Sequence, residues 1–319
     1  MVNRHRADSA NESARCFLGQ DAVFKTLLTF GEMADKFIDI EKIIASKNPK
    51  LLKWLPGFLL RYIKRILHEK DVNVFMEQNG HLKNFEFVRA VLKEFGVTLI
   101  VKGLENIPAS GRCIIAANHP LGGLDGLALM EAAGQKRPDI QFLVNDILMN
   151  LKSLDELFVP VNKHGAQYAM DSINNAYKSD RPVLVFPAGL VSRKQKHGIE
   201  DLVWRKSFVT QAQRNQSVIV PTFIDGRNSP RFYNLEVWRR RLGIKANIGM
   251  FYLVDEMYKQ KGKTITIIFG KPVAPEVLSS DVSAIVWSAK LKAHVYAIGS
   301  GKHDLEFSAA RSEKTKASA

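Results

Sequence analysis

The chain has 319 residues, of which 46% are hydrophobic and 24% are charged, as in an ordinary globular protein. Lys and Arg number 46 against 32 Asp and Glu, and the net charge of +14 favours an anionic partner such as a nucleic acid, a membrane face or an acidic carrier protein. With only two cysteines, we expect neither a disulfide framework nor a metal site. No run of about 18 apolar residues occurs, so we expect no spanning helix. No apolar stretch follows the first charges, so we expect no secretory leader.

Residues 1–95 are predicted to form a helical N-terminal region that begins with a polar stretch. Apolar side chains recur at helical spacing over residues 24–33 and again over residues 85–95. Between them, the segment LLKWLPGFLLRYIKRIL (51–67) combines an apolar stripe around Trp54 with several Lys and Arg. Two interpretations of this segment stay open: it lies in the interface of an anionic membrane, or it packs against the rest of the protein.

After residue 96 the pattern changes to short apolar strands that alternate with helices. Strands are predicted at residues 97–101, 113–117, 141–144, 183–186, 217–224 and 264–269, and helices near 125–134, 165–178, 201–214, 230–241 and 282–298. This alternation predicts an α/β fold in which helices pack on a sheet. Residues 96–299 form the expected main domain, and residues 300–319 are expected to be a flexible tail.

The segment CIIAANHPLGGLDGLAL (113–129) is the first candidate site. A buried strand ends at Ala117, a helix begins near Asp125, and His119 lies between them in a turn that contains a glycine pair. Open α/β sheets place their sites at the carboxyl ends of strands, where His119 lies. The Asp125 carboxylate is expected to reach one imidazole nitrogen and to leave the other as a general base. The alternative is that Asp125 only caps the helix and His119 only bonds the turn.

The segment VLVFPAGLVSRKQ (183–195) is the second candidate site. A strand runs into a turn with Gly189, and Ser192 and Arg193 follow. An Arg just past a strand end can bind a phosphate or carboxylate with two parallel hydrogen bonds, although a solvated basic loop is an equal alternative. Residues 191–245 contain twelve Lys and Arg against four Asp and Glu, which concentrates positive charge beside the predicted site.

The segment SVIVPTFIDGRNS (217–229) is the third. It predicts a core strand followed by a turn at Asp225 and Gly226, with Arg227 next in the chain. We interpret this segment either as a wall of the site or as ordinary turn chemistry.

Together these segments resemble the glycerolipid acyltransferase superfamily, which includes 1-acylglycerol-3-phosphate acyltransferases. Within it they are most similar to the hemolysin-like branch of amino-acid-lipid N-acyltransferases. The similarity covers roughly residues 95–275, and the blocks that carry it are 118–126 (NHPLGGLDG), 158–163 (FVPVNK), 186–189 (FPAG) with Ser192 and Arg193, 220–221 (VP) and 269–273 (FGKPV). Five residues separate His119 from Asp125, one more than the common family pattern, and the glycine pair is expected to absorb the extra residue.

The resemblance implies a mixed sheet flanked by helices, preceded by the N-terminal helical region. It also implies transfer of a fatty acyl group from acyl carrier protein or coenzyme A as co-substrate, with no further cofactor and no metal. In that scheme His119 and Asp125 are catalytic. The acceptor site would be formed by Asn118, Lys163, Gly189, Ser192, Arg193 and Arg227, with Arg193 and Lys163 holding an anionic group of the acceptor.

The acceptor is the least determined part of the scheme. The branch resemblance favours the amine of an amino acid, which would give an N-acyl amino acid on the way to an amino-acid lipid. The alternative is O-acylation of a lysophospholipid, and a third reading is an inactive relative that binds lipids or serves as a scaffold. The sequence cannot separate these alternatives, because an amino acid carboxylate and a lysolipid phosphate need the same cationic clamp.

Two rival classes find no support in the motifs. A nucleic-acid-binding protein would need a zinc-ligand pattern, an aromatic signature or a confined basic arm, and none occurs in the sequence. A serine hydrolase of the α/β type would need a Gly-x-Ser-x-Gly elbow, which is also missing. We therefore expect a bacterial enzyme of the reducing cytoplasm, peripheral on the inner face of the cell membrane, with an acyl thioester and an anionic membrane surface as partners and no nucleic acid.

Overall fold

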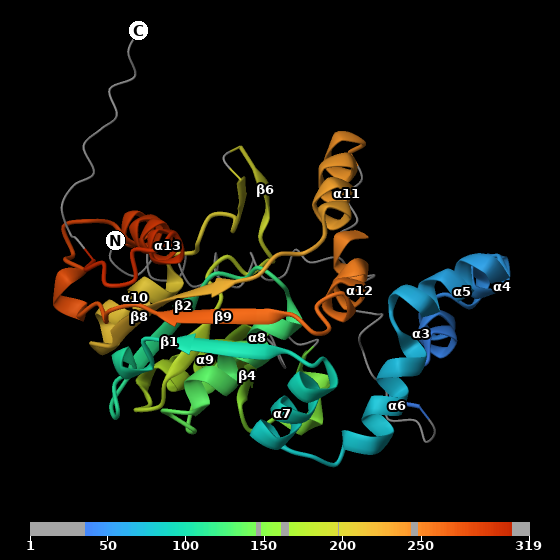
Figure 1. Ribbon diagram of the computed structural model, residues 1–319, viewed down its shortest axis with the longest axis horizontal. Coiled ribbons are helices and arrows are strands. Elements are labelled where there is room, and N and C mark those ends of the chain that lie inside the picture. The colour runs from blue at the N-terminus through green and yellow to red at the C-terminus, as the bar shows by residue number, and fades with distance from the viewer. Residues whose placement is uncertain (1–35, 145–147, 161–165, 197, 244–247, 308–319) are drawn as a thin grey trace, which may run out of the picture.

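The computed structural model describes residues 36–144, 148–160, 166–196, 198–243 and 248–307, and its main body is a seven-stranded sheet with helices on both faces (Figure 1). The strands lie in the order β1 (Thr98–Lys102), β9 (Thr264–Phe269), β8 (Val218–Asp225), β2 (Cys113–Ala117), β5 (Val183–Val185), β3 (Gln141–Val144) and β4 (Phe158–Pro160). β8 and β9 are antiparallel and every other neighbouring pair is parallel. The predicted α/β class with a mixed sheet is confirmed.

The five strands from β8 to β4 run in one direction, so their carboxyl ends meet at one edge of the sheet. We call this edge the carboxyl edge. β2 lies between β8 and β5, and all five of its residues are buried, which explains why its sequence is a continuous apolar run rather than an alternating one. The residues that follow β2 therefore leave the sheet near its centre.

Two hydrophobic clusters cover the two faces of the sheet. Side chains of β2 alternate between them: Ile115 belongs to the first cluster, and Ile114 and Ala116 belong to the second. The helices that contribute to the first cluster are α7 (Asn84–Glu94) and α8 (Gly123–Gly134), and those that contribute to the second are α9 (Ala166–Lys178), α10 (Ser207–Asn215) and α13 (Ala284–Gly299). Because both faces of β2 are buried, the position of its last residue, Ala117, is fixed, and so is the start of the turn that contains His119.

The N-terminal helices extend away from the sheet on the side of α12 (Tyr252–Tyr258) (Figure 1). They are α3 (Ile40–Lys47), α4 (Pro49–Trp54), α5 (Gly57–Ile66) and α6 (Glu69–Asn79). Their inner side chains form a cluster of their own, in which Ile43 and Ile66 are buried and Tyr252 of α12 is partly buried. The helix predicted over residues 24–33 lies outside the described residues.

Four elements were missed by the sequence analysis: β4, the hairpin of β6 (Arg193–Gln195) and β7 (Gly198–Glu200), and α12. The missed strands are three residues long, too short to show a period. α10 begins at Ser207 rather than near residue 201, because Asp201 and Trp204 are buried in a segment without regular secondary structure. In the described segments, no helix has both the length and the hydropathy needed to cross a membrane.

Residues beyond α13 were predicted to be a flexible tail. Phe307, which lies in that segment, packs against Trp287 and His294 with ring centroids 6.0 Å and 5.3 Å apart. The packed part of the chain therefore extends to residue 307, and residues 308–319 lie outside the description.

Candidate active site

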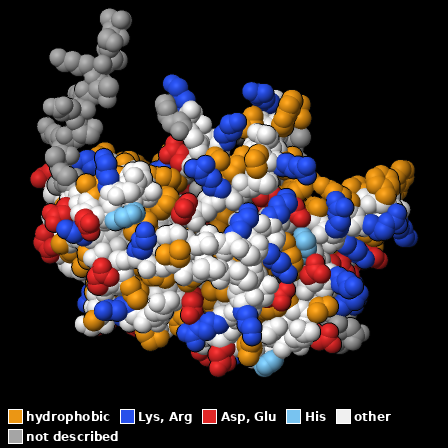
Figure 2. Space-filling model, viewed as in Figure 1, with side chains coloured by type: hydrophobic (Ala, Val, Ile, Leu, Met, Phe, Trp, Pro, Cys, Tyr) orange, Lys and Arg blue, Asp and Glu red, His pale blue; other side chains and the backbone are white. Residues whose placement is uncertain are grey.

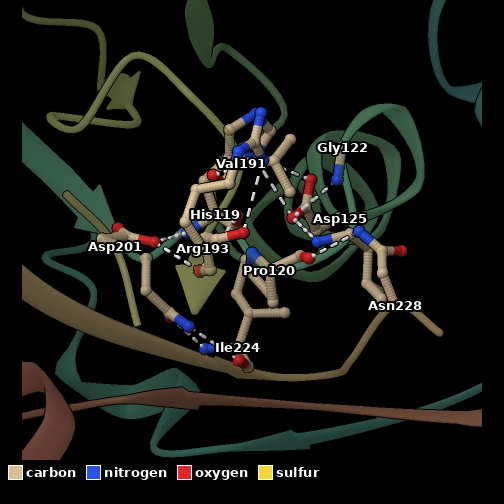
Figure 3. Close-up of polar contacts among 12 residues, drawn as sticks. His119, Pro120, Gly122, Asp125, Val191, Arg193, Asp201, Ile224 and Asn228 are labelled. Atoms are coloured by element: carbon tan, nitrogen blue, oxygen red, sulfur yellow. Dashed lines mark hydrogen bonds and ion pairs between the residues drawn. The ribbon is translucent and has the colours of Figure 1, made fainter. Parts of the chain in front are cut away.

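His119 and Asp125 face each other across the turn after β2 (Figure 3). Nδ1 of His119 lies 3.1 Å from both carboxylate oxygens of Asp125, and Asp125 is fully buried. One oxygen of Asp125 also accepts hydrogen bonds from the backbone N–H groups of Leu121 (2.7 Å) and Gly122 (3.2 Å). A carboxylate held in this way fixes the proton of His119 on Nδ1 and leaves Nε2 as the acceptor nitrogen. The His119 side chain is 16% exposed, so solvent reaches the ring.

The glycine pair makes this pairing possible despite the five intervening residues. Gly122 has φ +99° and ψ −125°, a backbone conformation essentially restricted to glycine, and a Cβ there would lie 3.4 Å from Leu253. α8 begins at Gly123, which places Asp125 in its first turn with its carboxylate on the N–H of Gly122. Asp125 therefore caps the helix and orients His119, so both interpretations of this residue apply.

The ring of Phe186 supports the imidazole from the side of β5. The two ring centroids lie 4.1 Å apart with planes 14° from parallel, so rotation of the His119 ring is hindered. Phe186 belongs to the FPAG block, and its ring lies against the His119 ring. The sequence motifs gave no sign of this contact.

Asn118 joins the end of β2 to β8. Its Nδ2 donates to the carbonyl of Ile224 (2.9 Å), and its Oδ1 accepts from the N–H of Ile224 (2.7 Å). On the far side of His119, Nδ2 of Asn228 donates to the carbonyl of Pro120 (3.1 Å). Asn118 is buried and its amide bonds backbone at both ends, so the structure gives it a positioning role instead of the predicted contact with substrate.

Asp201 is a buried carboxylate that holds the His119 turn from the opposite side to Asp125 (Figure 3). One of its oxygens accepts from the N–H of His119 (3.2 Å) and the hydroxyl of Ser192 (2.6 Å), and the other accepts from Nε1 of Trp204 (2.8 Å). Burial raises the pKa of the Asp201 carboxyl above its ordinary value, and the hydrogen bonds from Ser192 and Trp204 oppose this rise. The N–H of Ser192 also donates to the carbonyl of His119 (2.7 Å).

Asp201 was not predicted as a site residue, because the sequence places it at the start of a predicted helix. Ser192 was predicted to line the acceptor site, whereas the structure buries Ser192 between Asp201 and the backbone of His119. The signal that was available is an acidic residue three positions before a Trp in an apolar context.

Arg193 lies in the interior, between β6 and α11 (Pro230–Arg241). Its Nε is 3.5 Å from a carboxylate oxygen of Glu236, its Nη1 donates to the carbonyl of Val191 (2.8 Å), and its guanidinium lies 5.1 Å from the ring centroid of Phe232. The side chains of Arg193 and Glu236 are 6% and 4% exposed. The structure therefore commits Arg193 to the protein interior and not to the predicted acceptor clamp.

The other predicted binding residues have different surroundings. Gly189 has φ +66°, and a Cβ there would lie 3.0 Å from the Arg205 guanidinium, so Gly189 shapes the turn after β5. Lys163 lies outside the described residues. Arg227 is exposed just after β8, and its guanidinium makes no hydrogen bond or ion pair with another residue in the described ranges. Its neighbour Asn228 bonds the His119 turn, so Arg227 belongs to the same edge of the sheet.

Apolar side chains surround the glycine pair. Positions for a Cβ at Gly122 and Gly123 lie 3.4 Å from Leu253 and 3.8 Å from Met257, two residues of α12. Val191 lies 3.7 Å from the same point at Gly122. Among the described residues, no group of three or more His, Cys, Asp or Glu is arranged to hold a metal ion.

Comparison with known proteins identifies the family of the chain. A family model described as "Acyltransferase" matches residues 42–289. The chain belongs to this acyltransferase family. A relative named "Lyso-glycine lipid O-acyltransferase" from Phocaeicola vulgatus is 40% identical over 262 residues, which cover 81% of this chain and 94% of the relative. A relative of the same name from Bacteroides thetaiotaomicron is 40% identical over 263 residues, which cover 81% and 96%.

Among solved structures, the acyltransferase is similar to the 1-acyl-sn-glycerophosphate (LPA) acyltransferase PlsC from Thermotoga maritima. That match has 18% identity and a TM-score of 0.43, and it covers 76% of this chain and 92% of the other. The lipid acyltransferase activity that the resemblance implied is confirmed by the family and the two relatives.

Proposed function

We propose that this acyltransferase esterifies a hydroxyl group of a lyso-amino-acid lipid, of the lyso-glycine lipid class, with a fatty acyl group taken from a thioester. The observation that carries the proposal is the His119 imidazole, whose Nδ1 is held by buried Asp125 and whose side chain remains 16% exposed. The branch resemblance implied an amine as the acceptor. Two relatives at 40% identity are named for O-acylation, which favours a hydroxyl.

The proposed reaction needs one base and no covalent enzyme intermediate. Nε2 of His119 takes the proton of the acceptor hydroxyl as its oxygen attacks the thioester carbonyl carbon. The tetrahedral intermediate then collapses, the carbon–sulfur bond breaks, and the thiolate takes the proton from the imidazolium. Asp125 stabilises the positive charge on the ring between the two steps. General base catalysis of this kind contributes on the order of 10²–10⁴ in rate.

Arg227 is the proposed contact for the head group of the acceptor. A glycine that is acylated on its nitrogen keeps its carboxylate, which a guanidinium binds with two parallel hydrogen bonds. Arg227 is exposed at the carboxyl edge and follows the strand that Asn118 ties to the His119 turn. A lysolipid with a phosphate head group would use the same contact, so the acceptor series below includes one.

The acyl donor and the membrane are the proposed anionic partners. Acyl carrier protein and coenzyme A are both anionic, and the net charge of +14 favours either of them. The outer face of α4 and α5 exposes apolar side chains, with Trp54 86% and Phe58 68% exposed, among Lys53, Arg61 and Arg65. We propose that this face, the α4–α5 surface, lies on the anionic inner face of the cell membrane, where the lysolipid acceptor resides.

The test is product identification with purified protein. Acyl carrier protein and coenzyme A thioesters are each offered with a lyso-glycine lipid, free glycine and a lysophosphatidic acid. We expect an ester product from the lyso-glycine lipid, identified by its mass and by cleavage in mild alkali, and no product with His119→Ala. An alkali-resistant amide formed from glycine would overturn the proposed acceptor.

A further inference from the structure

α11 exposes a second apolar and basic surface far from α4 in the sequence. Trp238 is 60% exposed and Leu242 is 68% exposed, and their spacing of four residues places them on one side of the helix. Arg231 and Arg241 are exposed on the same side. We call these four residues the α11 surface. The opposite side of α11 is buried, so the exposed Trp and Leu are not needed for packing of the described residues.

α12 lies between the α11 surface and the α4–α5 surface. On one side, Leu253 of α12 packs against the buried Phe232 and Tyr233 of α11. On the other side, the hydroxyl of Tyr252 is 2.8 Å from the hydroxyl of Tyr62 of α5. Because α12 also borders the glycine pair of the His119 turn, the two surfaces flank the active site.

The charges of both surfaces fit an anionic bilayer. Residues 49–66 contain no Asp or Glu, and neither do residues 237–243. Figure 2 shows hydrophobic side chains among Lys and Arg at both projections of the molecule, over α11 and over α4 and α5. Tryptophan favours the boundary between lipid chains and head groups, and each basic residue near an anionic surface adds about 1 kcal/mol of attraction.

We propose that the α11 surface is a second membrane-contact site, and that the protein docks on an anionic bilayer at two points with the active site between them. In this orientation a lysolipid moves from the bilayer to His119 without entering bulk water. The inference rests on the proposed function, because it assumes a membrane-borne acceptor, and it adds a contact that the α4–α5 surface alone does not predict.

Tryptophan fluorescence tests the two contacts separately. The chain has four Trp, of which Trp204 and Trp287 are 1% exposed. Trp54→Phe therefore leaves Trp238 as the exposed Trp, and Trp238→Phe leaves Trp54. With brominated vesicles of phosphatidylcholine and phosphatidylglycerol, we expect quenching in both variants. Quenching of Trp54 without quenching of Trp238 would overturn the α11 contact and leave the proposed function intact, whereas the reverse result would count against the α4–α5 surface.

A paired substitution measures the strength of the contact. Trp238→Ser with Leu242→Ser should lower partition onto the same vesicles by about tenfold or more, because two large apolar side chains lose their lipid contact. The matched control is Ile285→Ser with Val286→Ser on α13, where both side chains are 44% exposed at the other end of the molecule (Figure 1). The control should bind as the unmodified protein does.

Unchanged partition of the α11 pair would overturn the proposal. Light scattering covers the competing occupant: if the unmodified protein is a dimer and the α11 pair is a monomer with normal vesicle binding, the surface binds a second copy of the chain and the proposal fails. Activity supplies a further measurement. The proposal would be supported if the Trp238→Ser, Leu242→Ser variant lost activity on a vesicle-borne acceptor and kept its activity on a water-soluble short-chain acceptor.

Discussion

At the scale of single residues, the candidate active site contains one imidazole and two buried carboxylates. Asp125 bonds the side chain of His119, and Asp201 bonds its backbone N–H. The two carboxylates accept only from donors that the turn itself provides, apart from Ser192 and Trp204 at Asp201. Both carboxylates are therefore expected to position His119, but only Asp125 also sets the tautomer of the His119 ring.

Asp125→Asn tests the tautomer. The amide oxygen should replace the carboxylate oxygen that accepts from Leu121 and Gly122, which turns the amide NH₂ toward Nδ1 of His119. The ring proton then moves to Nε2, which can no longer accept a proton. We expect kcat to fall by about 10²–10⁴ with little change in the melting temperature. A variant with more than half of the original kcat would show that Asp125 does not orient the base.

Asp201→Asn tests the backbone anchor. Both carboxylate oxygens of Asp201 accept hydrogen bonds. The NH₂ group of the substituted Asn would therefore face a donor in either orientation of its amide, and at least one hydrogen bond would be lost. We expect a loss of about 1–3 kcal/mol in the free energy of unfolding, measured by denaturant titration, together with a lower kcat. Ser192→Ala is the matched control, since it removes one donor and leaves the carboxylate, and it should cost less. Equal stability of Asp201→Asn and the unmodified protein would contradict this role.

At the scale of secondary-structure elements, α11 is attached to the β6–β7 hairpin by a buried ion pair. Arg193 lies at the start of β6 and Glu236 lies in the middle of α11. Arg239 is also within 3.2 Å of Glu236, so the carboxylate has a second cationic partner that is 18% exposed. This ion pair joins α11 to the hairpin and explains why a basic residue after the FPAG turn is buried.

Arg193→Met should therefore destabilise the protein more than it impairs acceptor binding. Removal of one partner of a buried pair costs about 3–5 kcal/mol, and Arg239 should keep the loss near the lower value. The measurement is the free energy of unfolding together with KM for the acceptor. Arg193→Met combined with Glu236→Met is the control, because it leaves no buried charge unpaired and should recover most of the loss. A large rise in KM at normal stability would instead return Arg193 to the acceptor site.

At the scale of the whole molecule, positive charge and apolar surface coincide on the side of the carboxyl edge. The chain carries a net charge of +14. Some of its Lys and Arg lie on the α4–α5 surface and the α11 surface, next to the exposed side chains of Trp54 and Trp238. Long-range attraction to an anionic surface would bring the protein to the bilayer, and the apolar contacts would then hold it there.

Salt should separate these two contributions. When ionic strength rises from about 0.05 M to about 0.5 M, screening should weaken binding to anionic vesicles by roughly tenfold, because surface charges interact over a Debye length that shrinks with salt. Binding to neutral phosphatidylcholine vesicles is the control, and it should change little. Sedimentation of the protein with vesicles measures both. Salt-independent binding to anionic vesicles would show that charge does not contribute.

The sequence by itself determined the positions of most strands and helices along the chain, the α/β class and the His119–Asp125 pair, whereas the mixed sheet was implied by the resemblance. These features are local: apolar runs and periods extend over several neighbouring residues, and only five residues separate His119 from Asp125. β4, β6, β7 and α12 escaped because they are short, whereas the equally short β5 was found because it lies in a longer apolar run, residues 183–186.

The tertiary structure alone decided what Asn118, Arg193 and Asp201 do. The partner of Asn118 is 106 positions away in the chain, and the hydrogen bond from His119 to Asp201 spans 82 positions. A polar side chain at the end of a strand looks the same in the sequence whether it contacts substrate or the protein interior. Only the packing of distant segments decides between the two, because a buried polar group must find its partner wherever the fold provides one.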